Sequence, residues 1–492
     1  MNESEKEQEK APIYEMLIAH ALKRTTPFHV PGHKQRSQPF YNGLHEEQAA
    51  LDTLMSIDIT ELSGTDDLHD PSGAIARAQE LAADCYGADE TRFLVGGSTS
   101  GNLAMILGIC EPGELVLAQR NVHKSIIHGL ALSGARCVFL EPSVDTRSGI
   151  AIAPTAATIS AAIAQYPEAK AIILCSPNYY GMTADVRTIV ELAHAADMPV
   201  LVDEAHGAHF GHHPELPQSA LQMGADVVVQ STHKMLSSLT MTAMLHMQGQ
   251  LAPRPAIRQA LRMVQSSSPS YPLMASLDLA RRQLHTQGAA LFEPALDVAR
   301  SIRRATAGLP FELLHADDPL KLSLKDASGR LSGVALQDML ERRGCLAEMA
   351  DASYVVLALG PGTRQQDGVA LIAALTDIAK ELEEKPDEAS AANANIERVE
   401  EWSRQALISE PVTIKRRIAA TTPVPLKAAA GRVCGEWVIP YPPGIPLLYP
   451  GEPIGEEVLA KLERLRDAGA RFQGATDVSL NEIQVLSEGD RL

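Results

Sequence analysis

The sequence predicts an α/β protein whose large domain holds a mostly parallel central sheet. Between about residues 72 and 245, short apolar runs alternate with Ala-rich segments of helical period: RFLVGG, ELVLAQ, RCVFLEP, AIILCSP, PVLVDEA and DVVVQST. This alternation is typical of βαβ units, in which helices cover both faces of a parallel sheet. Ligands of such sheets bind at the carboxyl ends of the strands. The polar residues that follow each run are therefore the first candidates for a functional site.

At 492 residues the chain is too long for one compact core, so we expect several packed units. Beyond Tyr271 the pattern predicts a long helix to about residue 309, then an α+β unit, and near the end a helix at about 455–468 before a final short strand. The charged, Ala/Asn-rich stretch 380–410 indicates an exposed helix or linker. We expect four parts, with smaller α+β domains at the C-terminal end: an N-terminal helix and linker arm (1–71), a large domain (72–300), a small domain (301–384) and a C-terminal domain (385–492).

The composition argues against several classes of protein. Lys and Arg number 43 against 61 Asp and Glu, a formal charge of −18 that would repel nucleic acid. No run approaches the roughly 18 apolar residues that span a bilayer, and the charged N-terminus lacks the features of a secretory signal. We therefore expect a cytoplasmic protein without nucleic-acid or membrane partners. The six cysteines contain no Cys-x-x-Cys pair, which argues against disulfides or a thiolate metal site.

The first candidate strand end is the segment GGSTSGN at residues 96–102, between an apolar strand and a helix. Free backbone N–H groups, together with the hydroxyls of Ser98 and Thr99, could hold a phosphate on the helix dipole. An ordinary Gly/Ser loop with a good N-cap is the structural alternative. The segment is not a P-loop, because it lacks the Gly-Lys-Ser/Thr ending.

The second candidate is Asp203, in the segment VDEAH after an apolar strand. A carboxylate at the end of a buried strand needs a cationic partner, and a protonated pyridine nitrogen would serve. A helix cap or a structural ion pair is the alternative. The Asp-Glu-Ala-His of helicases is another, but the acidic chain has no Walker A loop.

The third candidate is Lys234 in the segment STHK, directly after the apolar run of residues 227–230. Burial would lower the pKa of this amine toward what a nucleophile needs, whereas a surface lysine is the default for any single Lys. The order of the three strand ends favours the functional reading. Together they supply a phosphate grip, a partner for a pyridinium nitrogen and an amine for a Schiff base, which predicts a pyridoxal 5'-phosphate (PLP) enzyme.

Two other strand ends fit this picture. His123, after the strand at 115–117, could lie flat against a cofactor ring, with a core or capping histidine as the alternative. Asn178 could reach the phenolic oxygen of the ring, with an Asn-containing turn as the alternative. The histidines at positions 206, 209, 212 and 213 match no zinc spacing, so no metal is expected.

Taken together, these motifs resemble the bacterial ornithine/lysine/arginine decarboxylases of the aspartate-aminotransferase fold (PLP fold type I), and most of all their short Gram-positive form. The resemblance runs in collinear order over residues 11–490 and rests on FHVPGHK, ELSGTDDLHDPSG, GGSTSGN, RNVHKS, PNYYG, VLVDEAHGAHF, STHK, SSSPSYPLMASLD and YPPGIPLLYPGE. It departs where the GHK segment fails to continue toward a glycine. The chain also begins at the linker without the receiver-like domain of longer members, so no decamer is expected.

The resemblance implies a residue for each role at the cofactor. Lys234 would form the Schiff base, Asp203 would pair with the pyridine nitrogen and His123 would stack on the ring. His206 would lie near the phenolic oxygen. The remaining cofactor-binding residues would surround the phosphate: Ser98, Thr99, Ser231 and His233, with Ser267 reaching the phosphate of a neighbouring subunit in a homodimer with shared active sites.

The expected reaction is decarboxylation of lysine, arginine or ornithine to CO₂ and a polyamine precursor, with Lys234, His123 and Asp203 as catalytic residues. Glu452, Asp66 and Asp67 are candidate contacts for the cationic end of the substrate. Another PLP reaction (transamination, aldol cleavage or elimination) is the first alternative, because fold alone cannot choose among them. A non-catalytic homologue is the second. The sequence leaves open which basic amino acid is used.

Overall fold

The computed structural model describes residues 3–23, 25–36, 49–384, 407–417, 420–441, 444–467 and 469–487. These residues form two compact units, each made of two stretches of chain. The first unit combines residues 1–109 with 199–292, and the second combines 110–198 with 293–492. Most of the expected linker at 380–410 lies outside the described residues, although its first residues belong to a helix that ends at Glu384.

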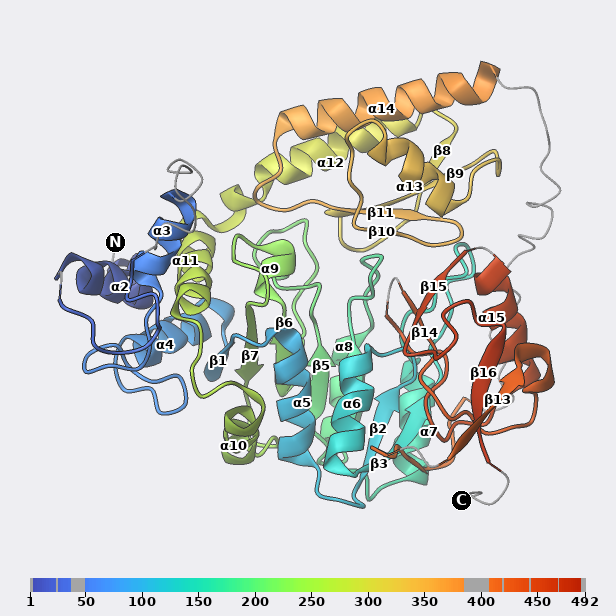
Figure 1. Ribbon diagram of the computed structural model, residues 1–492, viewed down its shortest axis with the longest axis horizontal. Coiled ribbons are helices and arrows are strands. Elements are labelled where there is room, and N and C mark those ends of the chain that lie inside the picture. The colour runs from blue at the N-terminus through green and yellow to red at the C-terminus, as the bar shows by residue number, and fades with distance from the viewer. Residues whose placement is uncertain are drawn as a thin grey trace. The chain divides into compact units, whose positions relative to one another are not determined.

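The described residues of the first unit form β-strands with helices around them (Figure 1). Its elements are α1 (Glu3–Gln8), α2 (Pro12–Leu22), α3 (Ala49–Ile57), α4 (Ala74–Tyr86), β1 (Glu90–Leu94), α5 (Gly97–Ile109), β5 (Val200–Asp203), β6 (Val227–Gln230), α9 (Thr232–Met235), β7 (Ala243–Met247), α10 (Arg254–Val264), α11 (Tyr271–Gln287) and the 3₁₀ turn η1 (Gly288–Leu291).

Within this unit the strands lie in the order β1-β7-β6-β5. β5 and β6 are parallel, and Asp203 pairs in register with Val229. β7 is antiparallel to both of its neighbours, which a purely parallel reading does not predict. β5, β6 and β7 are buried along their whole length, as expected for strands covered on both faces.

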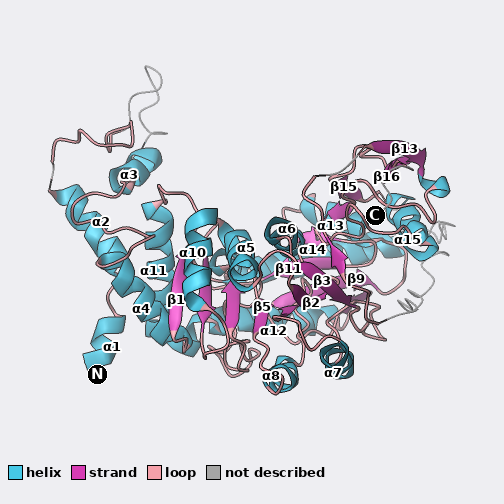
Figure 2. Ribbon diagram, turned by 90° about the horizontal axis from the view of Figure 1, so that it is seen from below, coloured by secondary structure: helices cyan, strands magenta, loops and turns pink. Residues whose placement is uncertain are grey.

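Helix α5 packs closely on these strands because it carries glycine where they touch. A Cβ on Gly101 would lie 2.7 Å from a methyl carbon of Leu94 and 2.8 Å from one of Val229. A Cβ on Gly108 would lie 2.7 Å from Ile257 of α10, and Figures 1 and 2 show α5 and α10 side by side. These close approaches hold the first turn of α5 near the ends of the strands.

The second unit contains the remaining elements. They are β2 (Leu115–Gln119), α6 (Lys124–Ser133), β3 (Arg136–Leu140), α7 (Ala156–Gln165), β4 (Ile172–Cys175), α8 (Val186–His194), α12 (Glu293–Thr306), β8 (Phe311–Leu313), β9 (Lys321–Asp326), α13 (Gly333–Glu341), β10 (Met349–Ala350), β11 (Val355–Ala358), α14 (Gln365–Glu384), β12 (Val412–Thr413), β13 (Thr421–Pro425), the 3₁₀ turn η2 (Leu426–Ala428), β14 (Ile439–Tyr441), α15 (Glu456–Asp467), β15 (Arg471–Gln473) and β16 (Glu482–Leu486).

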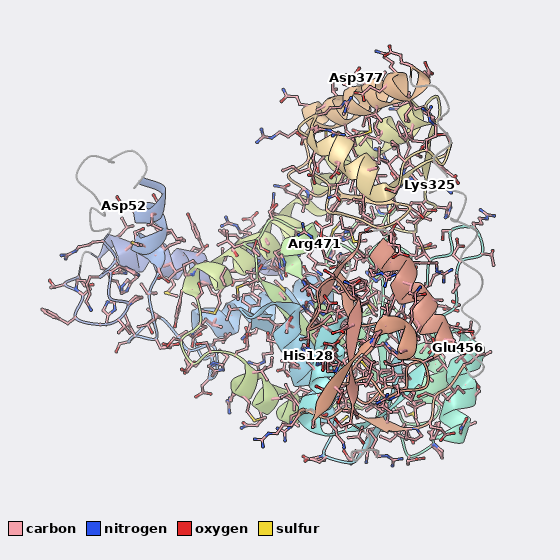
Figure 3. The ribbon with its side chains drawn as sticks, turned by 45° about the vertical axis from the view of Figure 1, so that its right-hand side comes forward. Asp52, His128, Lys325, Asp377, Glu456 and Arg471 are labelled. Carbon is pink, nitrogen blue, oxygen red and sulfur yellow. The ribbon has the colours of Figure 1, made fainter. Side chains whose placement is uncertain are left out.

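Among the described residues, the strands of this unit fall into four groups. β2 is parallel to β3 and β4, and β12 adds to β3 antiparallel. β10, β11, β9 and β8 form an antiparallel sheet accompanied by α12, α13 and α14 (Figure 1). On β9, Lys325 pairs with Glu312 at 2.9 Å and lies 5.7 Å from the ring centroid of Tyr354; Figure 3 labels this lysine.

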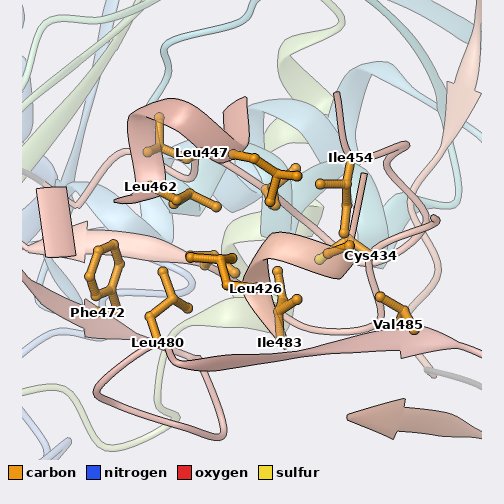
Figure 4. Close-up of a cluster of buried hydrophobic side chains, with 13 residues drawn as sticks. Leu426, Cys434, Leu447, Ile454, Leu462, Phe472, Leu480, Ile483 and Val485 are labelled. Atoms are coloured by element: carbon orange, nitrogen blue, oxygen red, sulfur yellow. The ribbon is translucent and has the colours of Figure 1, made fainter. Parts of the chain in front are cut away.

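The C-terminal part of the second unit has a core of its own. Two strand pairs, β13-β16 and β14-β15, pack with α15 around a buried apolar cluster (Figure 4). The cluster includes Leu426, Cys434, Leu462, Phe472 and Ile483. His128 of α6, labelled in Figure 3, joins this part to the β2–β3 region. Its ring packs edge-on against Trp437, with ring centroids 5.0 Å apart.

Arg120, the residue after β2, also fastens the C-terminal part. Its guanidinium donates to Glu452 at 2.8 Å and to the carbonyl oxygens of Pro446 and Leu447 at 2.9 and 3.0 Å. It lies 5.4 and 5.3 Å from the ring centroids of Phe139 and Tyr449. Both charged side chains are almost fully buried, at 4% and 8% exposed. The pair therefore holds its charges in a low-dielectric interior, where each needs the other.

We expect Arg120→Ala to lower the free energy of unfolding by about 3–5 kcal/mol, because it leaves the Glu452 carboxylate buried without its charge partner. Urea unfolding followed by circular dichroism would measure this loss. Arg300→Ala is the matched control, since Arg300 pairs with Asp297 at 2.8 Å on an exposed helix face. Its cost should stay below about 1 kcal/mol. Equal losses in the two variants would contradict the assigned role of Arg120.

The six apolar runs of the sequence each contain or overlap one strand, β1 to β6 in chain order, which confirms the α/β class. The single long helix expected after Tyr271 is wrong. α11 ends at Gln287, because Gly288 has a φ of 53° and a ψ of −136°, and a 3₁₀ turn precedes α12. One final strand was expected, but two follow α15. Helices α1 and α3 were not expected.

Among the described residues, no helix combines the length and the apolar character needed to cross a bilayer.

Candidate active site

The candidate site of the first unit centres on Lys234, which lies in the short helix α9 directly after β6. Its Nζ lies 3.0 Å from Nε2 of His206. His206 is 5% exposed and follows β5, the strand beside β6. The parallel pairing of β5 and β6 thus brings an amine and an imidazole within hydrogen-bond distance. Such a pair can pass a proton, and an amine must lose one before it acts as a nucleophile.

Asp203 is the last residue of β5 and is 2% exposed. Its Oδ2 accepts a hydrogen bond from Nδ2 of Asn102 at 2.8 Å, and its Oδ1 accepts one from the N–H of Ala205 at 3.2 Å. Burial raises the pKa of this carboxyl, and the positive charge of Lys234 opposes the rise. The site therefore contains a buried carboxylate that a cation would stabilise further.

A third group of side chains offers hydrogen bonds to an anion. Ser98 and Thr99 lie in the first turn of α5, whose free N–H groups and dipole favour a negative charge. This turn begins at Gly97, which has a φ of 70° and donates its N–H to the carbonyl of Met241 at 2.8 Å. A glycine suits that left-handed backbone.

The hydroxyls of Ser231 and Thr232 find no hydrogen-bond partner among the described residues, although both side chains are at most 1% exposed. Buried polar atoms without a partner are rare in proteins. The neighbouring His233 has a partner, because its Nδ1 lies 2.8 Å from the carbonyl oxygen of Thr242. The unsatisfied hydroxyls, the buried carboxylate and the amine fit PLP, which has a phosphate, a pyridine nitrogen and an aldehyde.

Ser267 lies between α10 and α11 and is exposed. An exposed position suits a residue expected to serve a neighbouring subunit, but that role stays a prediction.

His123 and Asn178 belong to the second unit. His123 caps α6, and its Nδ1 accepts a hydrogen bond from the N–H of Ser125 at 3.3 Å. Oδ1 of Asn178 accepts hydrogen bonds from the N–H groups of Tyr180 and Met182, both at 3.0 Å, so it fixes a turn. The capping and turn alternatives therefore describe real contacts. The cofactor roles of both residues stay predictions.

Sequence reasoning missed three residues of this region: Asn102, Thr232 and Glu204. Asn102 follows Ser98 by one helical turn, and that spacing is the signal that places it over the strand ends. Glu204 is 1% exposed, and its carboxyl accepts hydrogen bonds from the N–H of Ala220 and from Nε2 of Gln230, both at 2.7 Å. Burial raises the pKa of Glu204 to about 8, although the two hydrogen bonds lower it.

This raised pKa predicts a pH dependence of stability. Between the unfolded pKa of 4.5 and the folded value of about 8, the folded chain binds more protons at Glu204 than the unfolded chain does. Its contribution to the free energy of unfolding therefore falls as pH rises through that window. We expect Glu204→Gln to remove this dependence of the free energy of unfolding on pH. The free energy of unfolding of the variant should therefore exceed that of the parent by an amount that grows toward pH 8 and reaches about 1–3 kcal/mol.

Urea unfolding at several pH values within that window would measure this difference. Glu80→Gln is the control, because that side chain is 64% exposed and should leave this pH dependence unchanged. A difference between Glu204→Gln and the parent that does not vary with pH would contradict the prediction.

His212, which follows β5, and His246, which lies within β7, both pack against the ring of Tyr86. Tyr86 lies 4.6 Å from His246 and 5.1 Å from His212, centroid to centroid. Burial lowers the pKa of His212 to about 4 and that of His246 to about 3. Within the described ranges, no three or more His, Cys, Asp or Glu side chains gather where they could hold a metal ion.

Two of the acidic residues considered for the substrate cation have structural partners. Glu452 binds Arg120, as described above. Asp66 accepts hydrogen bonds from the N–H groups of Gly73, Ile75 and Ala76 at 2.7–3.2 Å, which fixes the start of α4.

Comparison with known proteins adds the family context. Residues 11–312 match the family model described as the major domain of Orn/Lys/Arg decarboxylases, and residues 404–480 match the model of their C-terminal domain. The uncharacterised protein YaaO of Bacillus subtilis is 41% identical, over 98% of this chain and 99% of its own. The arginine decarboxylase of Bacillus subtilis is 36% identical over the same shares.

Solved structures confirm the fold type. Lysine decarboxylase A from Pseudomonas aeruginosa superposes with a TM-score of 0.79 at 20% identity, over 97% of this chain and 80% of that one. A structure of SPT with PLP superposes with a TM-score of 0.51 at 18% identity, over 62% of this chain and 76% of that one. The predicted PLP-enzyme fold, type I, is therefore correct.

Proposed function

Because the chain belongs to the Orn/Lys/Arg decarboxylase family, we propose that it uses PLP to remove the α-carboxylate of a basic amino acid as CO₂. The observation that carries the proposal is the placement of Lys234 and Asp203 at the ends of two adjacent parallel strands. An amine for covalent attachment and a buried carboxylate for the ring nitrogen are what PLP requires of a protein. When bound, PLP supplies an electron sink for the bond that breaks.

In this proposal, Lys234 would hold the cofactor covalently through Nζ, and its amine would be free again while the substrate is bound. His206, 3.0 Å from Nζ of Lys234, accepts or returns the proton of this amine. Asp203 keeps a proton on the pyridine nitrogen, and Asn102 orients the carboxylate through its 2.8 Å hydrogen bond. Reprotonation of the substrate carbon falls to Lys234 or His123.

The remaining proposed roles concern binding of the cofactor. Ser98, Thr99, Ser231 and His233 bind the phosphate, and we add Thr232, because its buried hydroxyl finds no partner among the described residues. The roles of His123 on the ring face, of His206 at the phenolic oxygen and of Ser267 toward a partner subunit rest on the family resemblance, as do the homodimer and a place in polyamine biosynthesis. The role of Asn178 at the phenolic oxygen rests on its place after a strand, and the cytoplasmic location rests on the composition of the sequence.

Among the three candidate substrates we propose arginine, because an arginine decarboxylase of Bacillus subtilis is 36% identical over 98% of this chain. The PLP-loaded protein should be incubated separately with arginine, lysine and ornithine, and CO₂ and the amine product measured. Arginine should give the highest kcat/KM. Release of CO₂ from lysine alone would overturn the choice of arginine, and release from none of the three would overturn the proposed function.

A further inference from the structure

A cavity of about 340 Å³ opens in the first unit beside β1 and α10. None of the residues proposed to hold the cofactor lines it. Three of the side chains that line it are arginines, Arg92, Arg258 and Arg262. Such a gathering is notable in a chain whose formal charge is −18.

The contacts of these arginines leave the cavity cationic. Glu90 is shared by two of them, since its carboxylate lies 2.7 Å from Nε of Arg92 and 2.9 Å from Nη1 of Arg258. Arg262 donates from Nε to the neutral carbonyl of His69 at 2.9 Å. The one acidic residue in the lining is Asp70. Asp70 and Glu90 together supply two carboxylates against three guanidinium groups, so the net charge around the cavity is positive.

Two apolar side chains lie behind the wall of the cavity. Phe93 and Leu261 are almost fully buried there, at 0% and 5% exposed. The volume falls at the lower end of the range of about 300–1,000 Å³ that is usual for small-molecule sites. Guanidinium groups recognise phosphate through paired, charge-assisted hydrogen bonds. We propose that this cavity binds a phosphate-bearing small molecule of nucleotide size, with its phosphate on Arg258 and Arg262.

One lining residue connects the cavity to the proposed cofactor loop. Oε1 of Gln265 accepts the N–H of Val95 at 2.9 Å, and Val95 immediately precedes the segment 96–102. A ligand in the cavity therefore contacts a side chain that fixes the end of β1, where that loop begins.

The test uses the full-length protein loaded with PLP, so that the cofactor occupies its own phosphate site. Binding of inorganic phosphate, pyrophosphate, AMP and ATP is measured by calorimetry while the absorbance of the cofactor is followed. We expect saturable binding of at least AMP or ATP with unchanged cofactor absorbance. Arg258→Gln and Arg262→Gln should each weaken it by about tenfold, the effect of losing one charge-assisted contact.

Arg254→Gln is the matched control, because Arg254 lies on the same helix, pairs with Asp89 and does not line the cavity. It should leave the affinity within about twofold. Thermal unfolding of each variant verifies that it is folded. Because Arg258 and Arg262 are substituted in separate variants, one variant still tests the proposal if the other does not fold. Absence of saturable binding up to about 10 mM would overturn the proposal, as would equal weakening by Arg254→Gln or displacement of the cofactor.

Discussion

Replacing Lys234 by alanine should reduce kcat/KM for decarboxylation by at least about 10³-fold, since the change removes the amine that we propose attaches the cofactor. It should also abolish the covalent adduct that borohydride traps between protein and PLP. Activity is measured as CO₂ release, and the adduct is located by mass spectrometry of peptides. The fold should survive, because the side chain is lost from a four-residue helix that remains anchored between β6 and β7.

Lys170→Ala is the control for this experiment. Lys170 is 49% exposed and pairs with Glu114 at 3.1 Å, so its loss should leave both the rate and the adduct unchanged. A trapped adduct that persists in the Lys234→Ala variant would assign the cofactor to another lysine. Full activity without Lys234 would remove the basis of the proposed function.

Replacing Asp203 by asparagine should lower kcat by about 10²–10³-fold, the usual cost of removing one preorganised electrostatic contact from an active site. The amide keeps the shape of the side chain and can still accept a hydrogen bond from Asn102. It cannot supply the negative charge that would keep the pyridine nitrogen protonated. The loss should therefore appear in kcat more than in KM, and the absorbance spectrum of the bound cofactor should change with it.

Asp226→Asn is a matched control, because Asp226 is also 2% exposed and lies at the opposite ends of the same two strands, where it accepts the N–H of Val200 at 2.8 Å. That variant should keep kcat within about threefold if it folds, which thermal unfolding verifies. A similar loss of kcat in both variants would mean that the effect of Asp203 is one of stability and not of charge at the ring.

Much of the fold could be predicted because its signals are local. Each of β1 to β6 lies in or overlaps a short apolar run, and the burial of most of these strands makes such runs visible in one sequence. The residues of β7 do not indicate that it runs antiparallel to its neighbours. The direction of a strand depends on the path by which the chain returns to the sheet. The break at Gly288 was missed for a different reason: a single glycine in a helical pattern is often tolerated.

The candidate site divides in the same way. Lys234, Asp203 and the segment 96–102 could be found because each lies at or just after the end of a strand. The spacing of Asn102 from Ser98 could place it over the strand ends, but the contacts of Asn102, Thr232 and Glu204 depend on packing and could not be assigned from the sequence. Asn102 matters because it meets Asp203, 101 positions away, and Thr232 because its hydroxyl is buried without a partner among the described residues. The partners of Glu452 and Asp66 were also invisible, and they show that an acidic residue in a suggestive motif can serve the fold instead.

The guanidinium of Arg120 affects which parts of the second unit unfold locally and which do not. To lift the chain from Pro446 to Glu452 away from β2, a fluctuation must strip a buried cation of two carbonyl oxygens and a carboxylate at once. A surface loop of the same length would unfold locally at a free-energy cost near zero. The segment from Pro446 to Glu452 should instead exchange its amide protons nearly as slowly as β2 does. The C-terminal segment then belongs to the same cooperative unit as the strand that leads to His123.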